Sequence, residues 1–409
     1  MKKFLALLFI IPVISISLVV AQDISSILQQ YGISDEQIQQ AMEAASASSG
    51  QSITTTDQLM QYYIDKYEDA TGNTFDMDKF LNEATGGAID MSTYKQYSDK
   101  LNTAASSVNS ALDSLSASLV KSLPSMLSMI NIYPDSYIGQ LIGLPPHFAA
   151  GINTAFALVD ISSMSSSLMS AAGNFGIDTS SFSNIPSYLP LPIITADLRI
   201  GGVILPFDLG VSVVALNKGM MTPLANAAGI GSYLDNATVN FLTLNGDFRY
   251  CVMKEGVIKP EISVGGGYTY SKGDLGYNYN DMLAMGFNYS THIFYLDAQV
   301  SKKILFVTPF VGAKLMTDVT KVKYNWGVTG ETEEYITSYN NMLSTVGYSD
   351  YALSLANSGE TSTKFFSRVM PQVYGGIGFS IFVVKINTVV GYDFYTKTPS
   401  GAINLRIQI

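Results

Sequence analysis

At 409 residues the chain is long enough for two or three domains, and 47% hydrophobic against 14% charged residues is an apolar balance for a soluble protein. The formal net charge of -10, without a dense run of Lys and Arg, argues against a nucleic-acid partner. The single cysteine, Cys251, excludes an internal disulfide, and two histidines, His147 and His292, leave little for a metal site. We therefore expect no cofactor.

The N-terminus has the three parts of a secretory signal peptide. Basic residues at the start precede an apolar run from Phe4 to Val20, which ends in the small residue Ala21 before polar Gln22. We expect residues 1–21 to be removed after export; a retained transmembrane helix is the alternative, because the run is near the minimum of about 17 residues. No other segment approaches about 18 apolar residues, so a mature chain that enters a membrane must do so as a closed barrel.

Residues 22–123 predict an all-α region, expected to be a periplasmic domain or a plug. Ser34 is a good N-cap residue, with Gln37 three positions later. The longest helix begins near Asp90 and carries an apolar seam, which favours packing within a small helical domain, with an oligomerising coiled coil as the alternative. The seam contains Tyr94, Leu101, Val108 and Leu115, with Ala105, Leu112 and Leu119 at the alternate position.

Residues 124–146 predict a linker between two domains. Pro124, Pro134 and Pro145 interrupt apolar pieces and discourage a continuous helix. From His147 onward Gly, Tyr, Phe, Val and Thr dominate, and the apolar period changes from 3.6 to two. The domain boundary therefore falls in this stretch, and residues 147–409 form a mainly β domain.

The β domain contains successive segments that alternate apolar and polar residues. In the last one Leu405 and Ile407 point to one side and Asn404 and Arg406 to the other, a period that no helix sustains. Ten candidate strands span roughly 147–158, 193–203, 206–216, 237–252, 257–271, 291–303, 307–325, 365–381, 383–396 and 401–409.

Tight and long connections alternate along these strands, as in an antiparallel transmembrane β-barrel with short periplasmic turns and longer outer loops. We predict about ten strands, with 8–12 possible, and a soluble β-sandwich as the alternative. The chain end Ile409 is then periplasmic, and its strand pairs near Gly151 to close the sheet. The tight connections lie near 204–205, 253–256, 304–306 and 382, and the long ones near 159–192, 217–236, 272–290 and 326–364.

Signal peptide, alternation, loop asymmetry and an amphipathic last strand together resemble a bacterial outer-membrane β-barrel protein over residues 146–409. The resemblance implies outer-membrane lipid and the outer-membrane assembly machinery as partners. Barrels of this kind usually end in Phe or Trp, whereas this chain ends in Ile409. The order of parts is also similar to outer-membrane transporters of hydrophobic compounds, which combine an N-terminal hatch with a barrel; their Asn-Pro-Ala hatch motif is absent here.

If the apolar faces meet lipid, the opposite faces line the barrel lumen with charges of both signs. Such a lumen can be filled by ion pairs and hydrogen bonds, because eight to ten strands leave little room beyond side chains, or it can form a polar conduit or substrate site. The glycine runs 265–267 and 375–378 lie inside strands, where glycine allows curvature, a bulge or close approach by a plug. The predicted lumen residues are Asp197, Arg199, Asp208, Asp247, Arg249, Lys259, Glu261, Asp297, Lys314, Arg368, Lys385, Asp393 and Arg406.

A hydrolase site is weakly indicated. His292, near Ser290 and Asp297, is the one catalytic candidate, but period-two geometry directs it outward with Phe294, as an interfacial ring. We expect no enzymatic activity.

The long outer connection 326–364 is rich in tyrosine. Its Tyr335, Tyr339, Tyr348 and Tyr351 either contact a surface ligand or pack the loop over the barrel mouth. The sequence thus predicts an exported outer-membrane barrel acting as a small pore or transporter for a small solute. The alternative is a non-conducting structural, adhesin or surface-interaction barrel with ligand-binding extracellular loops.

Overall fold

The structure is a computed structural model that describes residues 35–54, 56–74, 91–135, 137–138, 147–174, 187–202, 205–219, 222, 236–279, 283–345 and 349–409. The expected signal peptide, residues 1–21, lies outside these ranges, as do the predicted N-cap Ser34 and residues 136 and 139–146 of the expected linker. Within them, no helix combines the length and the apolar character that a membrane crossing requires.

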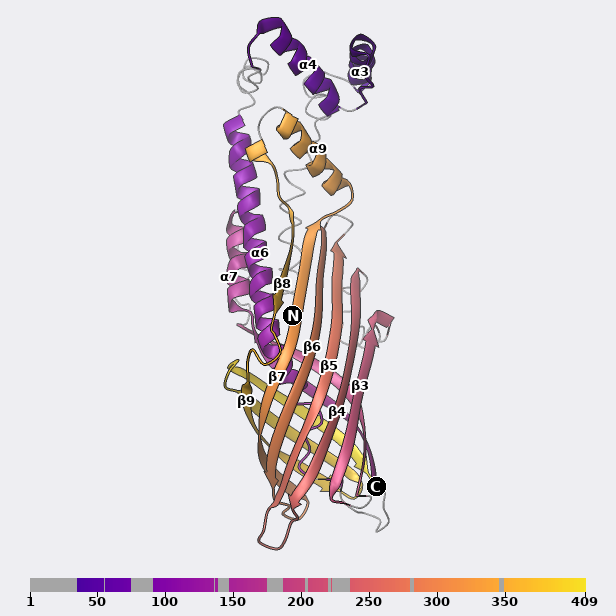
Figure 1. The fold of residues 1–409 in the computed structure, drawn as a ribbon, viewed down its shortest axis with the longest axis vertical. Helices are drawn as coiled ribbons and strands as arrows, with labels where there is room; N and C mark the ends of the chain where they lie inside the picture. The colour runs from indigo at the N-terminus through magenta and orange to yellow at the C-terminus, as the bar shows by residue number, and fades with distance from the viewer. Residues whose placement is uncertain are drawn as a thin grey trace.

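Ten antiparallel strands close into a barrel, and an eleventh, β8, extends one edge of β7 (Figure 1). Each of the ten predicted strands has a counterpart, so the predicted fold class is confirmed. The barrel strands are β1 (His147–Asp160), β2 (Tyr188–Gly201), β3 (Phe207–Asn217), β4 (Ala237–Met253), β5 (Glu261–Tyr279), β6 (Leu283–Ser301), β7 (Val307–Val328), β9 (Met370–Ile381), β10 (Val384–Asp393) and β11 (Thr398–Gln408); β8 spans Ala356–Ser362.

The barrel closes where the sequence predicts, between β1 and β11. Gly151 is opposite Arg406, and Phe148 and Ile409 exchange backbone hydrogen bonds of 3.0 and 2.9 Å. Side chains alternate along β11, with Leu405 exposed outside and Arg406 buried inside. Because closure pairs both edge strands, the barrel has no free edge at this seam, as a lipid environment demands.

The strand lengths differ most from the prediction at one hairpin. The stretch 272–290 is not a long loop: β5 and β6 continue through it as paired strands, with Tyr277 opposite Met285. Together with β7 and β8 they extend well beyond the rest of the barrel (Figure 1). The outward positions of this extension are polar, so the apolar alternation that identified the lower strands stops although the strands do not.

Helices gather at the end of the barrel that carries the long connections, opposite Ile409 (Figure 1). The apolar core at this end of the barrel contains Leu101, Val108 and Leu112 of α6, packed with Tyr324 and Trp326 of β7. The predicted seam therefore packs within the chain, on strands of the extension. The helices are α3 (Asp35–Ser49), α4 (Thr56–Thr71), α6 (Met91–Leu127), α7 (Ser162–Asn174) and α9 (Glu331–Thr345), with a short 3-10 turn η3 (Ser349–Tyr351).

Helix α6 runs through Pro124 to Leu127, past the boundary predicted at 123. A proline has no backbone N–H, so Pro124 leaves the carbonyl of Val120 without its helical donor. The guanidinium of Arg368, from the connection before β9, donates to that carbonyl at 2.7 Å. Arg368 is itself held by Asp318 of β7 at 2.7 Å. The barrel wall thus supplies the hydrogen bond that the proline removes, and the helix enters the barrel mouth intact.

Candidate functional site

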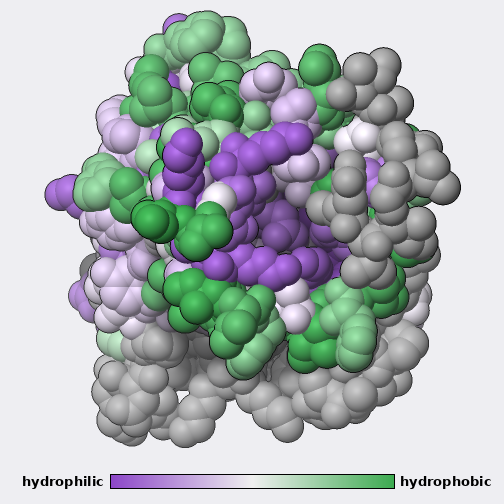
Figure 2. Space-filling model, turned by 90° about the horizontal axis from the view of Figure 1, so that it is seen from below, coloured by the Kyte–Doolittle hydropathy of each residue, from purple (hydrophilic) through white to green (hydrophobic). Residues whose placement is uncertain are grey.

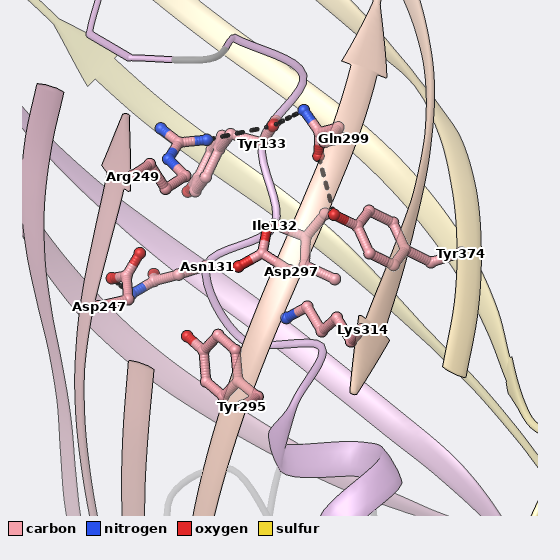
Figure 3. A pocket seen from close by; sticks show the side chains of 10 residues that line it. All are labelled: Asn131, Ile132, Tyr133, Asp247, Arg249, Tyr295, Asp297, Gln299, Lys314 and Tyr374. Atoms are coloured by element: carbon pink, nitrogen blue, oxygen red, sulfur yellow. Dashed lines mark hydrogen bonds between the residues drawn. The ribbon is translucent and has the colours of Figure 1, made fainter. Parts of the chain in front are cut away.

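The lumen is occupied by the chain itself. After α6 ends, residues 128–135, here termed the lumenal segment, pass between the barrel walls (Figure 3). Asn131 adopts a left-handed backbone conformation with φ of 63°, which asparagine tolerates better than most residues. This turn releases the chain from the helix and directs it down the lumen, where Ile130, Ile132 and Tyr133 are buried.

Side chains of the wall bind the backbone carbonyls of the segment. A buried carbonyl without a donor costs free energy, and each of these bonds contributes about 1 kcal/mol net, so together they fix the segment in one position. Donors from five strands bind the segment, and one from a sixth strand, Gln372, binds the end of α6 just before it. They are Gln372 to Ser125 at 3.4 Å, Lys314 to Ser128 at 2.5 Å, Asn387 and Asn404 to Ile132 at 2.9 and 2.8 Å, Gln299 to Tyr133 and Pro134 at 2.9 and 3.0 Å, and Arg249 to Asp135 at 2.7 Å.

Charged wall residues of β2, β3 and β4 form a buried ladder of alternating sign. Arg199 bonds both Asp208 and Asp247, the latter at 2.7 Å, and Arg249 bonds Asp208 at 2.8 Å. Gly210 lies between them: a Cβ there would sit 2.4 Å from the Arg199 guanidinium and from the Asp247 carboxylate. The missing side chain therefore opens the path along which Arg199 reaches Asp247. Buried charges in this arrangement neutralise each other in pairs.

Tyr133 anchors the segment to the seam strands. Its hydroxyl donates to Asn153 at 2.7 Å and lies 3.2 Å from Asp197. The Arg406 guanidinium stacks on its ring, 3.1 Å from the centroid, and pairs with Asp197 at 3.3 Å. One aromatic residue thus contacts β1, β2 and β11 together, across the closure of the barrel.

Glycines of the wall create the space that the segment fills. A Cβ at Gly378 would lie 2.4 Å from Pro134, and one at Gly391 would lie 3.1 Å from Met129. Gly378 belongs to the run 375–378, for which the sequence offered close approach by a plug as one explanation. Here that explanation is correct.

Little free space is left where the described part of the lumenal segment meets the wall. A cavity of about 10 Å³ lies beside Asn131, Tyr133, Asp297 and Lys314 (Figure 3). This volume accommodates the centre of about one water molecule. Viewed from the lower end, hydrophilic side chains gather inside a more hydrophobic rim (Figure 2). The lumen thus carries many charged and polar side chains, as in an outer-membrane barrel, together with an apolar cluster in which Met129 and Ile130 meet Ile293 and Met316 of the wall. The described part of the lumenal segment fills the barrel at this level.

Most of the predicted lumen residues face the interior. Lys385, near the lower mouth, pairs with Asp135 at 3.7 Å, and Glu261 lies at the inner edge beside Cys251. Lys259 does not line the lumen: it is exposed in the turn before β5, because that strand begins at Glu261 and not at 257. The residues that face the interior are Asp197, Arg199, Asp208, Asp247, Arg249, Asp297, Lys314, Arg368, Lys385, Asp393 and Arg406.

Sequence reasoning missed the neutral partners. Gln299 and Gln372 occupy the inward face of their strands, so the period of two identified their direction, but the prediction selected charges. Asn131 and Tyr133 carried no signal, because they fall in the aperiodic stretch that was assigned to a linker. Their role depends on the chain entering its own barrel.

His292 lies on the outer face, as predicted. Its Nδ1 lies 2.7 Å from the Tyr268 hydroxyl, with which it shares a hydrogen bond, and its ring centroid lies 4.9 Å from that of Tyr270. Asp297 is on the opposite, lumenal face, so Ser290, His292 and Asp297 do not converge. Among the described residues, no group of three or more His, Cys, Asp or Glu side chains could hold a metal ion.

The outer connection 326–364 packs on α6. Ser98 donates to the carbonyl of Tyr351 at 2.6 Å, and Asn102 donates to that of Ala352 at 2.9 Å. Around Tyr351 this favours the second of the two explanations, a connection that packs on the protein itself, whereas Tyr348 and the side chain of Tyr335 lie outside the described residues.

Similar solved structures are barrels of bacterial origin. They include the translocator domain of autotransporter NalP from Neisseria meningitidis (8% identity, 64% of this chain and 87% of that chain, TM-score 0.29) and the transport unit of autotransporter AIDA-I from Escherichia coli (9%, 74% and 99%, 0.30). A Pseudomonas aeruginosa FadL homologue is also similar (7%, 64% and 90%, 0.19). No family model and no curated protein matches the chain. The closed barrel with apolar exterior and polar lumen is the fold of an outer-membrane β-barrel protein.

Proposed function

We propose that this protein is a non-enzymatic outer-membrane barrel, sealed by its own lumenal segment, that holds its helical region and long connections at the cell surface. The observation that carries the proposal is the filled lumen: wall side chains from six strands bind the carbonyls of residues 125–135. A barrel closed in this way acts as an anchor rather than as an open channel.

Orientation follows from the two ends of the barrel. Short turns and Ile409 lie at one end, and barrels of this class place short turns in the periplasm. Helix α6 enters from the other end. Residues 128–135 then descend the lumen, and β1 begins at the Ile409 end, where Phe148 bonds Ile409. Helices α3, α4 and α6 therefore belong on the extracellular side under this proposal, in place of the periplasmic position expected from sequence.

Single-channel recording of the refolded mature chain tests the seal. We expect no steady conductance from the wild type. Replacing Asn387 and Asn404 by Ala removes both donors to the Ile132 carbonyl, so brief openings should follow. Lys95→Ala, on exposed α6, is the matched control and should stay silent. Sustained conductance of the wild type would overturn the proposal.

Surface labelling tests the orientation. In a Cys251→Ala background, Ser49→Cys at the end of α3 should react with a membrane-impermeant maleimide on intact cells. Lys303→Cys, in the turn between β6 and β7, should react after the outer membrane is permeabilised. The reverse pattern would place the helices in the periplasm.

A gated pore for a small solute is the second candidate. The wall carries charged side chains near both mouths, Asp393 above and Lys385 below, and an apolar cluster that includes Ile293 and Met316 lies on the wall between them. Displacement of the lumenal segment would therefore leave a path with polar ends and a partly apolar wall. A cysteine pair that locks the segment to the wall would separate the two functions. Solute uptake into vesicles that the lock abolishes would favour the pore, and no uptake before or after locking would favour the anchor.

A further inference from the structure

Two turns at the lower end of the barrel form one unit, here termed the basal turn pair: residues 254–260 between β4 and β5, and residues 302–306 between β6 and β7. Lys302 bonds the carbonyls of Gly256 and Lys259, the latter at 3.1 Å, and pairs with Glu255 at 3.2 Å. The Lys303 backbone N–H donates to Glu255 at 2.9 Å. These contacts hold the turns together as a defined surface.

Large apolar side chains at this surface are almost fully exposed. Val257 is 98% exposed, Ile258 90% and Leu305 84%. In a neighbouring turn, Phe382 is also 90% exposed. Such values are unusual for a patch that meets only water.

The backbone gives independent support. Leu305 and Phe382 adopt left-handed conformations with φ of 59° and 51°. Glycine or asparagine fits that region more easily, and bulky residues rarely occupy it. The two turn tips therefore carry large apolar side chains at positions where the local backbone favours small ones.

The height of the apolar exterior indicates which medium these side chains meet. On β6 the outward faces are apolar from Phe294, which contacts the rings of Tyr268 and Phe365, down to Val300. Six residues of a tilted strand rise only about 15 Å, whereas the lipid-facing band of an outer-membrane barrel is about 25 Å tall. Including the chain down to Ile304 brings the band to about 25 Å. On β6 the basal turn pair therefore completes the band.

Lysines surround the apolar tips. Lys254, Lys259, Lys302 and Lys303 lie in the two turns, with Glu255 as the one acidic residue of the unit. The chain as a whole has a net charge of -10, so this cationic surface reverses the general sign of the protein. Apolar side chains rimmed by lysines match the interface of an anionic lipid leaflet.

We propose that the basal turn pair inserts into the headgroup region of the periplasmic leaflet, with Val257, Ile258 and Leu305 among the acyl-chain ends and the lysines on anionic phospholipid headgroups. The apolar tips of the turns then lie within the membrane interface, in contact with lipid, while position 303 stays at the headgroup surface, within reach of periplasmic water. The inference rests on the proposed orientation of the barrel and does not depend on whether the lumen conducts.

Fluorescence depth measurement tests the insertion. In a Cys251→Ala background, an environment-sensitive dye is attached at Leu305→Cys, at Leu296→Cys on the lipid-facing wall, and at Glu360→Cys on the polar extension. Each protein is refolded into vesicles of phosphatidylcholine and phosphatidylglycerol. We expect the Leu305 probe to emit at shorter wavelength than the Glu360 probe and to be quenched by a nitroxide near the headgroups. Emission equal to that at Glu360, without such quenching, would overturn the proposal.

The lysines have a separate test. Nitroxide-labelled phosphatidylglycerol should quench the Leu305 probe more than labelled phosphatidylcholine does, with an enrichment of about fivefold for a single well-placed lysine. Replacing Lys254, Lys259 and Lys303 by Gln should remove the difference, whereas Lys321→Gln with Lys323→Gln on the extension should preserve it. Equal quenching by both lipids in the wild type would refute anionic recognition. A protected probe that responds to neither lipid would indicate a protein contact in place of lipid. The Leu296 probe verifies insertion of the barrel in every case.

Discussion

Strand β7 passes through two regions of opposite character. In the barrel its outward residues Val311 and Leu315 are apolar and its inward residue Lys314 is charged. In the extension its inward residues Tyr324 and Trp326 pack on α6 with apolar neighbours. The faces of one continuous strand thus exchange character between the membrane and the space above it.

The exchange shows that the medium around a strand, and not its position in the sheet, determines which of its faces is apolar. Below the boundary, lipid accepts apolar side chains and the interior must satisfy polar groups among themselves. Above it, water surrounds the outside and the hydrophobic effect favours an apolar interior. Helix α6 spans both regions: Leu112 packs in the upper core, and the carbonyl of Val120 bonds Arg368 in the barrel mouth.

The largest effect is expected from breaking the charge ladder of the lower region. Asp208→Ala leaves Arg199 and Arg249 without a shared buried partner, which should lower the free energy of unfolding by about 3–5 kcal/mol. Urea unfolding of the barrel in lipid vesicles measures the change. Asp99→Ala, which removes the exposed pair with Lys95, should cost no more than about 0.5 kcal/mol. Equal costs for the two variants would contradict the role of the ladder.

The upper region should respond to loss of apolar volume. Leu112→Ala empties space in the core between α6 and the extension and should cost about 3 kcal/mol there. Limited proteolysis of α6 should accelerate, while unfolding of the barrel stays close to that of the wild type. Ser110→Ala, on the exposed face of α6, serves as the control. A parallel loss of barrel stability would mean that the two regions unfold as one unit.

Two opposite substitutions on the outer face of β7 test where the lipid-facing part of the strand ends. Leu315→Arg places a charge in the lipid-facing band and should cost about 2 kcal/mol, depending on its depth. Lys323→Leu, outward on the extension, should leave stability nearly unchanged. Folding yield in vesicles and urea midpoints report both. Equal effects of the two variants on stability would mean that the boundary between lipid and water does not lie between residues 315 and 323.

The smallest effect is expected at the polar contact of the upper core. Asn109 accepts a 2.6 Å hydrogen bond from the indole of Trp326, and Asn109→Ala should cost about 1 kcal/mol. Because Trp326 is the one tryptophan of the sequence, its emission reports the docking of α6 directly. In Asn109→Ala the emission of Trp326 should shift to the red at a lower denaturant concentration than in the wild type. Asn102→Ala, which removes the hydrogen bond to the Ala352 carbonyl, is the comparison that distinguishes loss of the Asn109 contact from a general loosening of α6.

Sequence reasoning recovered the part of the fold whose signal is periodic. Strands with one face in lipid alternate strongly, so β11 and its closure onto β1 near Gly151 were predicted correctly. Where both faces lost that contrast the prediction failed: 272–290 continues as paired strand, and β8 has few residues typical of strands. The local alternation of apolar and polar residues does not distinguish a loop from a strand whose outer face is exposed to water and carries polar residues.

The sequence predicted the charged residues of the candidate site but not the passage of the chain through its own barrel. The inward direction of Arg199, Asp208 and Arg406 follows from alternation alone. That residues 128–135 occupy the lumen depends on contacts between positions more than 100 residues apart, such as Asn131 with Asn245. Pro124 even indicated the end of a helix, since the sequence gives no sign that Arg368 replaces the lost hydrogen bond.

The segment that fills the lumen also leads into β1, whose pairing with β11 closes the wall. One event, formation of this seam, therefore completes the sheet and encircles the chain. Above the segment, α6 is docked on the extension, so the segment is held at its upper end by that packing and at its lower end by the seam. Release of the segment from the lumen therefore requires undocking of α6 or reopening of the seam.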